Sequence, residues 1–456
     1  MENVLERQDE NKMGIMPVNK LLITMSVPMI ISMLVQALYN IVDSIFVAQI
    51  NENALTAVSL AFPVQSFMIA IVNGTGVGIN ALLSKSLGER NTEKASKAAN
   101  NGIFLGLLSC IVFIVFGFFG VQPFFKSQTG ISEIIKYGRE YLGICTGFSF
   151  ALIGQLTFER LLQSTGKTIY TMVTQSSGAI VNIILDPILI FGYFGFPKMG
   201  VTGAAVATVI GQTTAMMLAI YFNISKNHEI ILSFRDFRPD GEVIKEIYYV
   251  GIPSIIMMTI GSLMNYSINK ILMGFTATAT AVFGVYFKLQ SFVFMPVFGL
   301  NNGMVPIISY NFGAKKKERI TETIKLSVLY AVCIMLIGLT VFQLFPDKLL
   351  LLFNASDDML TIGVPALRTI SFSFLFAGYC IVIMSVFQAL GNGMMSLIVS
   401  IIRQLIVLLP AAYLLSRTGS LNAVWWAFPI AEVSALIFCS IFIKYIYDHK
   451  IKTLGE

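Results

Sequence analysis

The chain alternates between long apolar segments and short polar stretches rich in Gly, Asn and charged residues. A helix that spans a membrane needs about 20 predominantly apolar residues, and each of these segments is long enough. Strands of a membrane barrel would instead alternate in polarity over about ten residues per crossing. We therefore predict an all-α polytopic membrane protein with twelve transmembrane helices, at about 21–47, 54–83, 101–122, 137–158, 168–192, 200–222, 247–273, 278–310, 325–345, 360–387, 394–416 and 422–446.

The sequence contains an internal repeat at one constant offset, the one that carries position 28 onto position 253. This shift pairs Pro, Gly and amide residues: Pro28 with Pro253, Asn40 with Asn265, Gln65 with Gln290, Gly74 with Gly299, Gly78 with Gly303, Gly88 with Gly313, Gln163 with Gln388, and Gly166 with Gly391. Chance pairing of apolar segments explains matched Ile or Leu, but not these matches at a single offset. We predict an N-terminal six-helix bundle over 1–222, a cytoplasmic linker over 223–246 and a C-terminal six-helix bundle over 247–456.

Six helices per copy bring both copies into the membrane from the same side. The two bundles should therefore be related by a pseudo-two-fold axis along the membrane normal, an arrangement found in transporters. A substrate would sit in the cleft between them. From the first helices of the two copies and the paired positions, our cleft candidates are Tyr39, Gln65, Asn265, Gln290, Met33, Met258 and Met264. Flexible Met side chains can repack around unlike ligands, although most Met here should be ordinary packing residues.

Composition supports a membrane location. Of the 456 residues, 55% are hydrophobic and only 12% are charged, whereas a soluble domain carries about 25% charged residues. This excludes a soluble enzyme. The five cysteines lie in apolar stretches without short spacing, and the two histidines lie in polar segments, so neither disulfides nor a histidine-ligated metal or haem is expected. We predict no cofactor.

The distribution of basic residues predicts orientation. Four Lys and Arg residues fall within or at the ends of predicted spans and are left out of the count. Of the others, 21 lie in loops and tails on the side of both termini, Arg160 among them, and 6 lie on the other side. Basic residues in short loops mark the cytoplasmic side, so both termini should be cytoplasmic. Runs such as 315–317 fit this pattern better than nucleic-acid binding. We expect no cleavable signal in the polar stretch at 1–20. We expect a monomer in the plasma membrane.

Acidic residues inside the predicted spans are rare, and each costs at least about 2.5–3.5 kcal/mol at the bilayer centre on insertion scales. Gln36, Asn40 and Asp43 share one helical face, and Asn182 and Asp186 share another. Two carboxylates close together cannot both ionise cheaply unless a cation lies between them. The group therefore suits Na⁺ binding or proton exchange. The structural alternative makes Asp43 a helix-end residue and Asp186 a cap before the helix breaker Pro187.

The second copy helps to separate these alternatives. At the repeat offset, Asp43 is replaced by Ile268 and Asp186 by Ala411, whereas Asn40 keeps its amide partner. A purely structural acid in a duplicated frame could well be kept in both copies. The asymmetry therefore favours an ion site confined to the first bundle.

Proline and glycine in the spans have two interpretations. Pro28 and Pro253 each remove a helical hydrogen bond, which gives either a hinge that opens and closes the cleft or a fixed kink. Glycines of the second and eighth spans are expected mainly to let helices approach closely, since small residues allow this in membranes. These are Gly74, Gly76, Gly78, Gly299 and Gly303.

The second half also carries charged residues in or near its spans. A buried Arg or Lys needs a partner, so we expect Glu432 to pair with Arg403 or Lys288. The alternative is that the basic ends reach the membrane interface instead.

These features together resemble the multidrug and toxic compound extrusion (MATE) family, and most closely its DinF/MepA-like branch. The resemblance covers essentially the whole chain. It rests on the order and spacing of several stretches: 39–43 (YNIVD), 182–187 (NIILDP), 203–208 (GAAVAT), 311–314 (NFGA) and 429–432 (PIAE).

The resemblance implies a cation-coupled antiporter that exports bulky, often cationic organic compounds by alternating access, in exchange for H⁺ or Na⁺. By motif match, Asp43, Asn182 and Asp186 would carry the ion, and Thr208 would add an oxygen ligand. Some members have an acidic residue in the seventh span, where this chain has Asn265 and Asn269. That departure leaves the first-bundle site as the clear candidate.

Other functions remain open on sequence grounds. The nearest alternative is a flippase of lipid-linked oligosaccharides from the same superfamily. A channel or a membrane-embedded enzyme belongs to a different class, and the sequence offers no catalytic grouping of His, Cys or Ser with a base. Carboxylate and amide oxygens suit both Na⁺ and H⁺, so the coupling ion is open as well.

Overall fold

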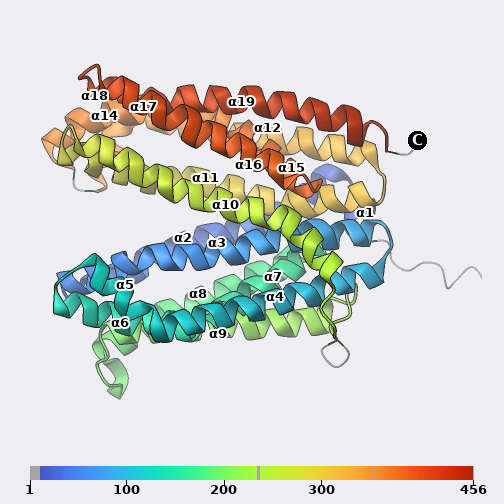
Figure 1. Ribbon diagram of the computed structural model, residues 1–456, viewed down its shortest axis with the longest axis horizontal. Coiled ribbons are helices and arrows are strands. Elements are labelled where there is room, and N and C mark those ends of the chain that lie inside the picture. The colour runs from blue at the N-terminus through green and yellow to red at the C-terminus, as the bar shows by residue number, and fades with distance from the viewer. Residues whose placement is uncertain (1–10, 234–236, 354, 455–456) are drawn as a thin grey trace, which may run out of the picture. The chain divides into compact units, whose positions relative to one another are not determined.

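The computed structural model describes residues 11–233, 237–353 and 355–454, and every regular element in those ranges is a helix (Figure 1). Ten helices are long and apolar enough to cross a membrane. Two further pairs are bent, Ser132–Gly147 with Ser149–Ser164 by 45° and Asp357–Ser371 with Phe374–Ala389 by 50°, and counting each pair as one span gives twelve. The all-helical prediction is confirmed. The breaks in the fourth and tenth spans were not predicted.

The chain forms two compact units. Unit 2 comprises residues 31–251 and unit 1 comprises 1–30 with 252–456. Helices α2 (Val18–Ala48) and α10 (Gly241–Met273) contribute to both. Unit 2 otherwise contains α3 (Glu52–Gly88), α4 (Thr92–Phe119), α5 (Val121–Gln128), α6 (Ser132–Gly147), α7 (Ser149–Ser164), α8 (Thr168–Phe191), η1 (Tyr193–Gly195) and α9 (Val201–Lys226).

Unit 1 contains the remaining elements. They are α1 (Lys12–Ile15), α11 (Ala277–Gly313), α12 (Lys317–Leu344), α13 (Pro346–Leu351), α14 (Asp357–Ser371), α15 (Phe374–Ala389), α16 (Gly393–Ile401), η2 (Ile402–Leu408), α17 (Leu409–Ser416), α18 (Leu421–Val424), α19 (Ala427–Ile446) and η3 (Tyr447–Ile451). The stretches η2 and η3 are π-helical.

The repeat predicted from the sequence extends to the boundaries of the helices. The bounds of α3, α4 and α7 shift by the repeat offset onto those of α11, α12 and α15, and the span of α8 shifts onto 393–416 in the same way. Turns repeat too, because Gly166 and Gly391 both adopt a positive φ, of 83° and 76°, a conformation that glycine reaches without steric cost. Even one buried hydrogen bond is duplicated: Ser84 Oγ donates to Ser164 O at 2.7 Å, and Ser309 Oγ donates to Ala389 O at 2.8 Å.

Polar residues start equivalent helices in both halves. Asn51 caps α3 by accepting a hydrogen bond from Ala54 N at 2.7 Å, and Thr276 caps α11 by accepting one from Ala279 N at 3.0 Å. Such caps satisfy amide groups that have no partner within the helix. Each half thus carries its own local signals for the same backbone.

The boundary between the two units falls inside α2 and α10, next to Pro28 and Pro253. The N-terminal part of α2 packs on α11, where Ser26 Oγ donates to Leu300 O at 3.3 Å. The N-terminal part of α10 packs on α3 and also reaches α4, where Lys94 pairs with Glu246 at 2.9 Å. The first helix of each half therefore begins against the second helix of the other half.

The predicted domain boundaries at 222/223 and 246/247 were drawn at the polar linker. The division into two compact units follows the packing of the helices and falls at other positions, inside α2 and α10. The predicted boundaries describe the two copies of the repeat, and they stay a prediction. Parts of the tail and linker used in that prediction, 1–10 and 234–236, lie outside the described residues.

Glycines allow these contacts, as predicted. A Cβ at Gly78 would lie 2.0 Å from Ile247 O, and one at Gly303 would lie 2.5 Å from Ser26 Oγ. A Cβ at Gly299 would lie 2.6 Å from the Cα of Ile30. Because these distances are shorter than any real Cβ contact, the helix crossings require residues without a side chain. Gly76 serves another contact, since its Cβ would meet the side chain of Arg160 at 2.9 Å.

Candidate functional site

Asp43 and Asp186 meet inside unit 2. The part of α2 beyond the unit boundary carries Asp43, α8 carries Asp186, and the two carboxyl groups are in hydrogen-bond contact. Asp186 is fully buried, and Asp43 is partly buried. Two carboxylates in contact repel each other unless they share a proton or hold a cation. The pairing predicted from the sequence is therefore present in three dimensions.

Asn182 and Thr208 complete the group from α8 and α9, which run alongside each other in unit 2 (Figure 1). With the Asn182 amide nitrogen facing Asp186, it donates to Asp186 Oδ2 at 3.3 Å, and its oxygen accepts from Thr208 N at 3.1 Å. In the opposite orientation of this amide, Asn182 Nδ2 donates to Thr208 Oγ1 at 3.4 Å. Thr208 Oγ1 also donates to Ala204 O at 3.0 Å. In the first orientation the Asn182 amide presents an N–H group to the carboxyl pair, and the hydroxyl oxygen of Thr208 lies next to this amide.

Two carboxyl oxygens in this group lack hydrogen-bond partners among the described residues: Asp43 Oδ1 and Asp186 Oδ1, both buried. A buried acceptor without a donor is costly, so these atoms are the ones that a proton or a small cation would satisfy. No three or more His, Cys, Asp or Glu side chains come together as metal ligands in the described part of the chain. The chemistry of the group is that of hard oxygen ligands.

Pro187 does not end the helix. α8 continues to Phe191, so Asp186 is an interior helical residue, and the alternative that made it a cap before a helix break is wrong. Proline at this position deprives the carbonyl of Ile183 of its helical donor. Asp43 lies within the last two turns of α2, which ends at Ala48. Asp43 is therefore both a helix-end residue and a member of the carboxyl pair.

The neighbouring candidates on α2 divide into two groups. Tyr39 lies within electrostatic range of Asp43 and Asp186 and joins their surroundings. Gln36 is partly buried and Asn40 is exposed, and in the described part of the chain neither side chain forms a hydrogen bond with the carboxyl pair. Their role as ion ligands stays a prediction.

Two residues near the pair escaped the sequence analysis. Tyr141 and Cys145, four residues apart on α6, both lie within electrostatic range of Asp43. Gln65, a predicted cleft residue, reaches this group by donating from Nε2 to Tyr141 Oη at 3.5 Å. The i, i+4 spacing of a Tyr and a Cys could have been a signal, but Cys145 was interpreted only as a packing residue.

The other cleft candidates are distributed over both units. Met33 belongs to unit 2, whereas Asn265, Gln290, Met258 and Met264 belong to unit 1. Asn265 Oδ1 is buried without a partner among the described residues, and Met258 is exposed. The structure describes each unit by itself, so a shared cleft stays a prediction.

A buried acid and base in α7 were missed. Glu159 is 1% exposed and accepts hydrogen bonds from Gln155 Nε2 at 3.1 Å, Thr174 Oγ1 at 2.8 Å and Gln175 Nε2 at 2.8 Å. Three donors explain how a carboxylate is accommodated in the interior. The neighbouring Arg160, assigned above to a cytoplasmic loop, lies in α7 and donates to Asn73 Oδ1 at 3.4 Å. That assignment is corrected: Arg160 is part of a helix.

In unit 1, Glu432 pairs with Arg403 rather than with Lys288. Arg403 Nη1 lies 3.1 Å from Glu432 Oε1. Lys288 Nζ instead lies 5.9 Å from the centre of the Phe353 ring. The predicted ion pair is confirmed, and its basic member is now identified.

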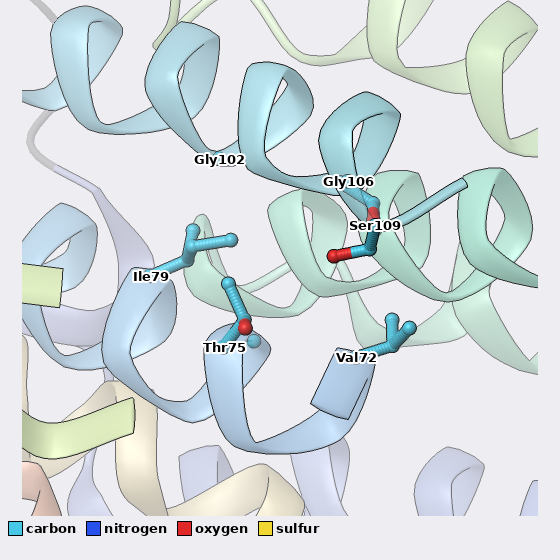
Figure 2. A pocket seen from close by; sticks show the side chains of 8 residues that line it. Val72, Thr75, Ile79, Gly102, Gly106 and Ser109 are labelled. Carbon is cyan, nitrogen blue, oxygen red and sulfur yellow. The ribbon is translucent and has the colours of Figure 1, made fainter. Parts of the chain in front are cut away.

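Two cavities in unit 2 differ in size. The smaller one, of about 10 Å³, lies between Thr75 and Ile79 on one side and Gly102, Gly106 and Ser109 on the other (Figure 2). It holds no more than a water molecule. The larger one, of about 340 Å³, falls in the size range of small-molecule sites. Only apolar residues line it, so it offers no partner for a charge: Pro63, Val64, Phe67, Ile71, Val112, Phe113, Phe116 and Phe124.

Known proteins share both the sequence pattern and the fold. The chain is 28% identical over 431 residues to a multidrug export protein MepA from Staphylococcus haemolyticus, covering 93% of each chain. It is 25% identical over 423 residues to an FAD transporter from Shewanella oneidensis, covering 93% of this chain and 94% of the other. An outward-facing structure of a multidrug resistance MATE family transporter superposes with a TM-score of 0.91 at 25% identity, covering 98% and 99% of the two chains.

The sequence profile of the MatE family matches this chain twice, over residues 28–188 and 253–414. The two matches fall on the two copies of the repeat and together cover most of the chain. Each match begins at the helix-interior proline of its copy, Pro28 or Pro253. The chain belongs to the MatE family, and it is a multi-pass membrane transporter of the multidrug export type.

Proposed function

We propose that this transporter is an antiporter in which a monovalent cation, Na⁺ or H⁺, binds between Asp43 and Asp186 and drives the export of bulky organic compounds, many of them cationic. The observation that carries the proposal is the contact between two carboxyl groups that each keep a buried oxygen without a partner among the described residues. Asn182 contacts both Asp186 and Thr208, so both residues lie close enough to position the carboxyl pair or to add an oxygen ligand when the amide is reversed.

A cation that enters down its gradient gains about 2.3 kcal/mol per charge for each 100 mV of membrane potential. Coupling requires the cation and the organic compound to favour different conformations, because a ligand shifts an equilibrium only by its differential affinity for the two states. Asp43 lies on the part of α2 that belongs to unit 2, whereas residues up to Ile30 of the same helix belong to unit 1. Binding at Asp43 would therefore act on a helix that joins both units, with Pro28 as its flexible point and Pro253 as the counterpart in α10. We further propose that both termini are cytoplasmic.

The test is export from proteoliposomes in which a Na⁺ gradient or a pH gradient is imposed separately. One of the two gradients should drive accumulation of a cationic dye against its own gradient in the wild type. Asp43→Asn should abolish this accumulation, since an amide cannot balance the charge of a cation. Glu322→Gln is the matched control, because Glu322 is an exposed carboxylate of α12.

The same vesicles can separate the alternatives. Because one relative is named an FAD transporter, FAD should be assayed beside the dye. Dye movement that equilibrates without uphill accumulation would indicate a passive pore and would contradict antiport. Movement of a lipid-linked oligosaccharide without dye export would favour a flippase. Wild-type accumulation by Asp43→Asn would refute the proposed ion site.

A further inference from the structure

The ion pair of unit 1 lies deep in two spans. Arg403 lies near the middle of the span 393–416, within the π-helical stretch η2, and Glu432 lies on α19. Their side chains are only 19% and 14% exposed. Charges at this depth are costly and usually functional, and π-helical turns often occur at functional sites. The candidate ion site of unit 2 does not involve either residue.

The repeat relates this pair to that candidate site. At the repeat offset the span of α8 matches 393–416, so Arg403 corresponds to Gly178, one helical turn before Asn182. Glu432 corresponds to Ala207, next to Thr208. The ion pair therefore joins the same two helices, at nearly the same level, as the Asn182–Thr208 contact does in the first half.

Within the described structure, the ion pair also leaves one carboxylate oxygen without a hydrogen bond. One N–H of Arg403 donates to Glu432 Oε1, whereas Glu432 Oε2 is buried and has no partner among the described residues. Arginine and a carboxylate that serve only as a clamp between helices are best joined by two parallel hydrogen bonds. A carboxylate with one oxygen left open resembles Asp43 and Asp186, each of which also keeps a buried oxygen without a partner in the described structure.

We propose that Glu432 is a monovalent cation site whose cation is supplied by the chain itself as the guanidinium of Arg403. The second half carries its carboxylate at a different position of the same helix pair and holds its cation permanently, so an exchangeable ion binds only in the first half. This inference rests on the proposed coupling at Asp43 and Asp186 for its meaning in transport. Removal of Arg403 should open Glu432 to Na⁺ or to a proton.

Unit 1 contains a natural reporter for this site. Trp425 and Trp426 are the two tryptophans of the sequence, and both belong to this unit. Trp425 is fully buried and lies between α18 and α19, seven residues before Glu432. Two further titratable groups, Tyr286 on α11 and Cys380 on α15, lie within electrostatic range of Glu432 and stay unchanged in every variant below.

The experiment measures tryptophan fluorescence and the thermal midpoint of the full-length protein as Na⁺ replaces choline at fixed pH. All variants carry Asp43→Asn and Asp186→Asn, so the first-half site makes no contribution and its failure cannot affect the result. With Arg403 and Glu432 intact, no saturable response to Na⁺ is expected. Arg403→Met should gain one, or gain a response to lowered pH if the site takes a proton. Adding Glu432→Gln to Arg403→Met should remove the response.

Arg403→Gln guards against misfolding of the Met variant, because it keeps a donor for Glu432 Oε1 and removes only the charge. It should show the same gain of response. Arg403→Lys keeps a tethered cation and should stay insensitive to Na⁺. If Arg403→Met and Arg403→Gln are both insensitive to Na⁺ and to pH, or if the response persists without the Glu432 carboxylate, Arg403 is a helix clamp and the proposal is wrong.

Discussion

Helices α8 and α9 bring Asn182 next to Thr208 beside two aspartates, whereas the matching helices of the second half bring Arg403 next to Glu432. The backbones of the two halves agree closely, down to one duplicated Ser hydrogen bond. The first half brings two carboxyl groups together, and two of their buried oxygens lack partners in the described structure. In the second half a positive charge is already present. If the proposed ion site is right, one frame supports an exchangeable ion in one half and a fixed cation in the other.

The largest expected difference is in ion-driven export, between a variant that lacks an acid of the first half and a variant that lacks the acid of the second half. Asp186→Asn should reduce ion-driven export to background, because the remaining carboxyl group no longer needs a cation to balance a pair. Glu432→Gln should leave the dependence of export on the ion gradient unchanged, since its cation belongs to the chain. The measurement is dye accumulation in proteoliposomes as a function of the imposed gradient. Equal loss of ion dependence in both variants would remove the distinction between the halves.

The second effect concerns the stability of unit 1. Arg403→Met alone should lower stability by about 3 kcal/mol, because it leaves a carboxylate without its partner in an apolar region. The double variant Arg403→Met/Glu432→Gln should lose less, because it removes both charges. Thermal midpoints of the purified protein in detergent measure the difference. Equal midpoints for the single and double variants would show that the two charges do not stabilise each other.

Much of the fold was accessible from the sequence because the repeat is carried by polar, Pro and Gly residues. Gly78 and Gly303, for example, mark helix crossings that a side chain would block, and this constraint is visible in the sequence as a matched pair. The division of α2 and α10 between the units was not accessible. It depends on which helix each N-terminal segment packs against, and apolar surfaces in a chain of this composition do not encode a unique partner.

The candidate site was predictable where burial of charge is costly, and less so elsewhere. Asp43 and Asp186 stood out because each is an acid within an apolar segment. Glu159 did not, since it lies near the polar end of its predicted span and its donors Thr174 and Gln175 come from another helix. The bends after Gly147 and Ser371 were also missed, because the apolar pattern continues through both of them.

The third effect tests the helix crossing of unit 2. Gly78→Val should destabilise the protein by about 1–3 kcal/mol, because the new Cβ would lie 2.0 Å from Ile247 O and the backbone would have to move. Gly143→Val is the control, since a Cβ at Gly143 has no neighbour within 4 Å in the described structure. The readout is the thermal midpoint in detergent. Similar midpoints for both valine variants would argue that α10 does not pack tightly on α3.

The smallest effect separates two asparagines that the sequence placed in one site. Asn182 contacts both Asp186 and Thr208, whereas Asn40 is exposed and forms no hydrogen bond with the carboxyl pair in the described part of the chain. Asn182→Ala should weaken the apparent affinity for the coupling cation about tenfold, which corresponds to about 1.4 kcal/mol and to the loss of one ligand or positioning group. Asn40→Ala should leave that affinity unchanged. The cation concentration at half-maximal export measures both. An equal shift in the two variants would place Asn40 in the ion site during transport, and the cation would then be held by α2 as much as by α8 and α9.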